Sequence, residues 1–243
     1  MTAEPKLQTI IIPLLLFAIS MGFIETAIVI YLRDIYYPEG FAFPLKPVPG
    51  WHLAIEMVRE ICTLVMLGAV AWLSGITFIR RFSAFLFIFG IWDLFYYIGL
   101  WLSLGWPSSI FTWDILFLIP VTWAGPVLAP VICSISMICI AAIFEWNRNR
   151  KKMKIINLPS LLLIIAGALV IFISFIYDYS LIILKGIYLD NFLSLAKDAG
   201  FMKELTTFIP DRFQWELFGI GMLLIFTGTY FTVDKIKLNK VRQ

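Results

Sequence analysis

The sequence predicts an all-α, polytopic integral membrane protein. Of its 243 residues, 61% are hydrophobic and 14% are charged, whereas a soluble domain carries about 25% charged residues. Several apolar runs exceed the roughly 18 residues that mark a transmembrane helix. A membrane β-barrel is not favoured, because its sequence would show short segments of alternating hydrophobicity.

Six transmembrane helices are expected in a single transmembrane domain, residues 1–243. Their expected ranges are 8–32, 52–74, 82–106, 125–146, 158–184 and 215–233. The first run is not expected to be a cleaved signal peptide, because its apolar residues continue too far and no A-x-A-like site follows.

An outer amphipathic segment is expected between the last two helices, over residues 186–209. Its composition predicts a surface helix over 190–199 that stops at Gly200, followed by a second piece over 201–209. Apolar residues in both pieces favour a position on the membrane surface or over the helix bundle.

A proline-broken segment precedes the fourth helix. One unbroken helix from Asp114 to Trp146 would be about 50 Å long, against a hydrocarbon core of about 30 Å. Proline removes an N–H donor and clashes with the preceding helical turn. We therefore expect a short helix or re-entrant piece over 114–119, and a backbone that leaves helical geometry between Pro120 and Pro126. Such backbone is tolerated at membrane depth only against protein or a wet cavity.

The basic residues predict the orientation of the chain. Arg80 and Arg81, the basic run over 148–154 and the basic carboxyl-terminal tail all fall on one side of a six-helix topology. Because cytoplasmic loops are enriched in Lys and Arg, this side and both termini are expected to be cytoplasmic. The proline- and aromatic-rich loop over 33–51 is then expected to cover the outer mouth of the protein.

Ionisable residues inside the apolar runs are candidate functional residues. Such groups are costly in lipid and normally face a bundle interior or a cavity. His52, Glu56 and Glu60 recur at helical spacing, so they share one face of the second helix, with Arg59 beside them.

Counting helical turns from the outer ends predicts that acids of the first three helices meet in an outward-facing pocket. We expect Asp114 at the outer surface, and His52, Tyr96 and Tyr97 at the mouth of this pocket. The predicted residues of the pocket are Glu25, His52, Glu56, Arg59, Glu60, Asp93, Tyr96, Tyr97 and Asp114.

Three functions are compatible with this pocket, because its acids outnumber its one arginine and require protons, water or a cation. The working hypothesis is transport or coupling of a proton or small ion, with Arg59 as counter-charge. The second is a membrane-embedded enzyme that acts on a lipid-borne substrate at the outer leaflet. The third is an accessory structural subunit of a larger membrane complex, in which the charges serve packing.

Each hypothesis predicts a different structural feature. Ion transport requires a continuous polar path inward from the pocket. An enzyme requires an opening to lipid or a cleft at the interface. An accessory subunit would expose a flat apolar face and have no cavity.

A divalent metal ion is compatible with four carboxylates of the pocket, Glu25, Glu56, Glu60 and Asp93. Haem is not expected, because His52 is the only histidine. The chain lacks a P-loop, a dinucleotide-binding glycine motif, a nucleophile elbow and an H-E-x-x-H motif. The expected partners are the lipid bilayer and other membrane proteins, and no nucleic acid, since the basic run indicates topology.

The predicted orientation can be tested with introduced cysteines. Glu39→Cys and Lys203→Cys should each react with a membrane-impermeant thiol reagent added to intact cells, because both positions are expected outside. The parent protein, which carries only its own cysteines, gives the background of labelling. If both positions react only after the cells are opened, the orientation is the opposite of the predicted one.

Overall fold

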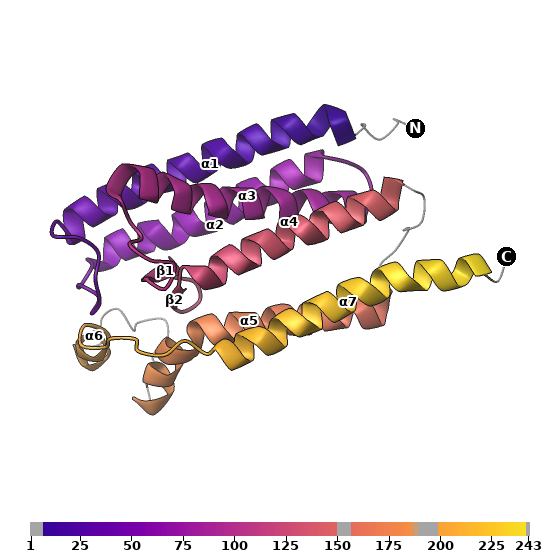
Figure 1. The fold of residues 1–243 in the computed structure, drawn as a ribbon. Helices are drawn as coiled ribbons and strands as arrows, with labels where there is room; N and C mark the ends of the chain where they lie inside the picture. Colours follow the sequence, from indigo (N-terminus) through magenta and orange to yellow (C-terminus); the bar gives the residue numbers. More distant parts are fainter. Residues whose placement is uncertain (1–6, 150–156, 187, 189–198, 242–243) are drawn as a thin grey trace.

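The computed structural model describes residues 7–149, 157–186, 188 and 199–241. These residues form seven helices and one two-stranded antiparallel sheet (Figure 1). The fold is therefore helical, as predicted. The helices are α1 (Leu7–Tyr36), α2 (Gly50–Leu73), α3 (Phe78–Leu104), α4 (Leu128–Asn149), α5 (Leu158–Lys185), α6 (Ala199–Leu205) and α7 (Trp215–Val241), and the strands are β1 (Trp113–Phe117) and β2 (Trp123–Pro126).

The long helices run side by side in two groups (Figure 1). In the first group α3 packs on α1, α2 and α4, and in the second α5 packs on α7. Strand β2 contacts both α4 and α5, so the hairpin connects the groups. Small residues let membrane helices approach closely. A Cβ atom on Gly221 of α7, for example, would lie 2.7 Å from the carbonyl oxygen of Gly167 in α5.

Five helices of the described residues are long and apolar enough to cross a membrane: α1, α3, α4, α5 and α7. Helix α2 has 24 residues, but Glu56, Arg59 and Glu60 lie in its first half, so a sixth crossing stays a prediction. The start of α1 and the end of α7 lie at the same end of the molecule (Figure 1). An even number of crossings requires this arrangement, while the side of the membrane on which they lie stays a prediction.

Helix α3 begins about one turn earlier than the sequence predicts. The Oγ1 atom of Thr77 accepts a hydrogen bond from the backbone N–H of Arg80, so Arg80 and Arg81 lie in the first turn of the helix and not in a loop. The side chain of Arg80 is buried and forms an ion pair with Glu145 of α4. Gly105 follows the last turn with a φ of 64°, a left-handed conformation that suits glycine.

The proline-broken segment is a β-hairpin, and the prediction of a short helix over 114–119 is wrong. Asp114 lies opposite Gly125, and the register shifts between Ile115 and Phe117. The prediction that the backbone leaves helical geometry between Pro120 and Pro126 is confirmed. Pairing between two strands satisfies backbone groups where proline removes helical donors. Re-entry of this segment into the bilayer stays a prediction.

The outer amphipathic segment is described only in part. Of the helix predicted over 190–199, all but Ala199 lies outside the described residues. Gly200 does not stop a helix, because it lies inside α6. Helix α6 ends at Leu205 and contacts α5, so the second predicted piece is helical only in its first half.

Candidate functional site

A partly open cavity of about 830 Å³ is lined by side chains of both helix groups and of the hairpin. Cavities of roughly 300–1,000 Å³ are typical of sites for small molecules. Of the predicted residues, all but His52 line it: Glu25, Glu56, Arg59, Glu60, Asp93, Tyr96, Tyr97 and Asp114. His52 instead shares a hydrogen bond with the hydroxyl group of Tyr36.

The lining of the cavity has a polar wall and an apolar wall. The predicted acids and Arg59 come from α1, α2, α3 and the hairpin. Facing them are apolar and aromatic side chains of α5 and α7, such as Phe172 and Met222. Toward the start of α3 the lining is also apolar, with Phe82, Leu86 and Phe89.

Arg59 neutralises two of the acids. Its Nε atom donates to Glu56 Oε2 at 2.6 Å, and its Nη1 atom forms an ion pair with Glu25 of α1. The adjacent Thr26 donates from Oγ1 to the carbonyl oxygen of Tyr96 at 3.1 Å, which fixes the rotation of α1 against α3. These contacts hold three helices in register around the polar wall.

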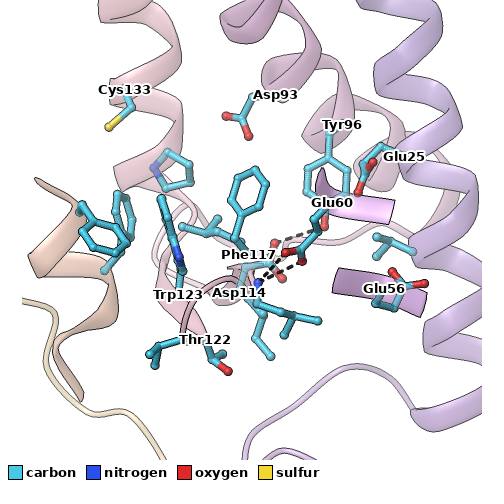
Figure 2. A pocket seen from close by; sticks show the side chains of 18 of the residues that line it. Glu25, Glu56, Glu60, Asp93, Tyr96, Asp114, Phe117, Thr122, Trp123 and Cys133 are labelled. Carbon is cyan, nitrogen blue, oxygen red and sulfur yellow. Dashed lines mark hydrogen bonds between the residues drawn. The ribbon is translucent and has the colours of Figure 1, made fainter. Parts of the chain in front are cut away.

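Glu60 and Asp93 have different partners. The backbone N–H of Leu118 donates to both carboxylate oxygens of Glu60, at 3.0 and 2.9 Å. Ser134 of α4 donates from Oγ to Asp93 at 2.6 Å. Figure 2 shows Glu60 and Asp93 around the same space, with Phe117 of the hairpin between their helices. Within the described part of the chain, neither acid takes part in a salt bridge.

Asp114 is buried, so its predicted position at the outer surface is wrong. The residue is only 2% exposed. Arg33 Nη2 lies 3.2 Å from Asp114 Oδ1, and the hydroxyl groups of Tyr96 and Tyr97 donate to Oδ2 at 3.4 and 3.3 Å. The physical reason is the hairpin, whose first strand turns Asp114 toward α1 and α3. Burial raises the pKa of Asp114 to about 6, although Arg33 opposes this increase.

Arg33 is a residue of this site that the sequence analysis does not assign to it, and Ser134 is another. Its guanidinium group lies 3.7 Å from the ring centre of Trp106 and 4.8 Å from that of Phe41. These cation–π contacts connect Arg33 to the loops that follow α1 and α3. The sequence does carry a signal that Arg33 belongs to the site. Arg33 lies eight residues after Glu25, and residues eight apart lie on the same face of a helix.

The acids do not converge on one point. Two pair with Arg59, one accepts from a backbone N–H, and one accepts from a serine hydroxyl. In residues 7–149, 157–186, 188 and 199–241, no three His, Cys, Asp or Glu side chains form a group that could hold a metal ion. This geometry does not support a metal site built from Glu25, Glu56, Glu60 and Asp93.

Arg33→Gln should destabilise the folded protein strongly. Removing one partner of a buried ion pair leaves a buried charge uncompensated and costs about 3–5 kcal/mol. Arg212→Gln is a matched control, because Arg212 and its partner Glu216 are 72% and 64% exposed, and such pairs contribute about 0–1 kcal/mol. Thermal unfolding of both purified variants in detergent, followed by circular dichroism, measures the difference.

The loss in Arg33→Gln should shrink as the pH falls through about 6, the pKa of Asp114. Because this pKa is raised on folding, the contribution of Asp114 to stability is greatest below about pH 4 and declines as the pH rises through 6. When Asp114 is protonated it carries no charge, so replacing Arg33 no longer removes an ion pair. An equal loss at about pH 5 and about pH 8 would contradict the pairing.

Glu60→Gln and Asp93→Asn should each leave the melting temperature unchanged or raise it. Neither acid pairs with an arginine, and neutralising one relieves repulsion among the remaining acids. Glu25→Gln is the matched control and should lower stability by about 1–3 kcal/mol, because Arg59 loses a charged hydrogen-bond partner. A clear loss in both Glu60→Gln and Asp93→Asn would favour a purely structural role for these acids.

No protein-family model, no curated protein and no solved structure matches this chain. Its function is therefore argued from the shape of the cavity and the chemistry of the side chains that line it.

Proposed function

We propose that the protein is a membrane-embedded enzyme that binds a lipid-borne, amphipathic substrate and moves protons to or from its polar group. The observation that carries this proposal is a single cavity with a carboxylate-rich wall facing a long apolar wall. An amphipathic molecule has the same division between a polar group and an apolar chain.

The apolar wall supports a substrate that comes from the bilayer. Side chains from α5 and α7 line the cavity, among them Ile164, Phe172 and Ile225. A hydrocarbon chain in contact with these side chains leaves lipid at little cost, since both environments are apolar. A small hydrated ion would gain nothing from this wall.

The polar wall supports proton transfer. Glu60 and Asp93 each accept hydrogen bonds from neutral donors, and within the described residues neither forms a salt bridge. A carboxyl group that is not held ionised by a fixed cation can gain and lose a proton near neutral pH. We assign Glu60 and Asp93 the role of acid–base groups, and Arg59 that of the counter-charge for Glu25 and Glu56.

Proton or small-ion coupling is the second candidate, and Glu60 and Asp93 favour it because acids without a fixed cation could also bind a proton or an ion. A transporter also needs a polar path to the opposite face of the membrane. The cavity lining toward the start of α3 is apolar instead, with Phe82, Leu86 and Phe89. The cavity itself argues against a purely structural subunit, which has no need of one.

Filling the cavity should displace the substrate. Ala168 of α5 lines the cavity, so Ala168→Trp should sharply reduce the lipid that stays bound through purification, measured by extraction and mass spectrometry. The matched control is Ala166→Trp, since Ala166 lies on the same helix, is exposed as Ala168 is, and does not line the cavity. Equal lipid content in both variants and the wild type would refute binding in this cavity.

The chemical step is tested with Glu60→Gln and Asp93→Asn. Membranes that contain either variant should keep the bound lipid and lack a modified lipid that wild-type membranes contain. If wild-type protein in liposomes instead carries a proton current that Glu60→Gln abolishes, with lipid composition unchanged, the second candidate replaces the enzyme.

A further inference from the structure

The lining of the cavity holds more acids than bases. The charged residues that line it, among those described, are Glu25, Glu56, Glu60, Asp93 and Asp114, and Arg33, Lys46 and Arg59. Arg33 pairs with one acid and Arg59 with two, whereas Lys46 is exposed and lies over the ring of Tyr37. When these groups are ionised, the lining carries an excess of negative charge, and a cation bound there would neutralise part of it.

Asp93 is the acid of this excess that a bound molecule can reach. Glu60 is 4% exposed, and both of its oxygens accept from the N–H of Leu118. Asp93 is partly exposed, and Ser134 donates only to its Oδ2 atom. Its Oδ1 atom accepts no hydrogen bond from the described residues and is not among the fully buried unpaired atoms, so it keeps accessible surface.

A row of aromatic rings crosses the cavity from the hairpin to α5. The ring centres of Phe117 and Trp123 lie 5.2 Å apart, and those of Trp123 and Phe172 lie 4.9 Å apart. All three rings are partly exposed and line the cavity. In Figure 2 the carboxyl group of Asp93 points into the space that Phe117 and Trp123 border. The face of an aromatic ring attracts a cation within about 6 Å of its centre, so these rings favour the same charge as Asp93 does.

The three kinds of polar group that a lipid can carry differ in how they fit this lining. An anionic phosphate or carboxylate group would be repelled by the excess of acids. A hydroxyl group could donate to Asp93, but it would leave the charge of Asp93 uncompensated. An ammonium group has three N–H donors and a positive charge, so it suits both the carboxylate and the aromatic faces.

We propose that the substrate is a long-chain amine without a phosphate group, whose ammonium group binds between Asp93 and the rings of Phe117 and Trp123. Its hydrocarbon chain lies against the apolar wall of α5 and α7. This substrate class rests on the proposed function, and it assigns Asp93 the binding of the polar group.

Two probes with the same chain and different polar groups test the inference. Dodecylamine is protonated near pH 7, because the pKa of a primary amine is about 10, as it is for lysine. The second probe, 1-dodecanol, carries a neutral hydroxyl group instead. Native mass spectrometry of the full chain titrated with each probe gives the two affinities. Wild-type protein should bind the amine about tenfold more tightly or better, because only the amine forms an ion pair with Asp93.

Asp93→Asn should abolish this preference, because it keeps the size of the side chain and removes its charge. The apolar wall still holds the chain, so this variant should bind the amine about as tightly as the wild type binds the alcohol. The ratio of the two affinities stays meaningful even if the variant is less stable, since both probes meet the same protein. Asp34→Asn is the matched control and should keep the preference, because Asp34 is exposed and does not line the cavity.

Phe117→Leu should reduce the preference for the amine by about two- to fivefold, the worth of one cation–π contact. Phe111→Leu is its control and should leave the ratio unchanged, because Phe111 is 62% exposed and does not line the cavity. An unchanged ratio in Phe117→Leu would contradict the aromatic contact.

The outcomes separate this inference from the proposed function. Equal binding of amine and alcohol by the wild type, or an unchanged preference in Asp93→Asn, would overturn the ammonium site and leave a lipid-binding cavity intact. Failure of both probes to bind the wild type, together with no effect of Ala168→Trp on retained lipid, would overturn the lipid site itself.

Discussion

The buried ion pair between Arg33 and Asp114 is the interaction on which the arrangement of the hairpin and the first helix group depends. Arg33 lies in the last turn of α1, and Asp114 belongs to the hairpin, so the pair fixes the hairpin against the first helix group. Aromatic rings of two loops cover the guanidinium group and exclude water from it. Because a buried charge without a partner is costly, an arrangement of the hairpin that separates the two residues is disfavoured.

The need of a buried charge for a partner also divides the remaining acids into two kinds. Glu25 and Glu56 have Arg59 as a fixed cation, and their contacts tie α1 to α2. Glu60 and Asp93 accept from neutral groups that position them without neutralising them. The hydrogen bonds to Leu118 and Ser134 therefore hold these two acids at the cavity wall and leave their charge available to a ligand. This difference, more than the number of acids, supports the proposed role of Glu60 and Asp93 in proton transfer.

The position of the hairpin connects the fold to the proposed substrate. Its second strand contacts both helix groups, and side chains of the hairpin line the cavity alongside the acids and the apolar wall. In the proposed function, the apolar chain and the polar group of an amphipathic lipid match these two walls, whereas an ion matches only the polar one.

The sequence by itself determined the helical membrane class and the stripe of Glu56, Arg59 and Glu60, because hydropathy and helical periodicity are properties of neighbouring residues. It also indicated that proline prevents a continuous helix before α4. Only the tertiary structure decided that this segment is a hairpin, that Asp114 is buried, and that Arg33 is its partner, since 81 positions separate the two residues. Likewise, the acids looked like one cluster in sequence and proved to have separate partners. Helical spacing fixes which face a side chain occupies, but the packing of that face against other helices decides which charge it meets.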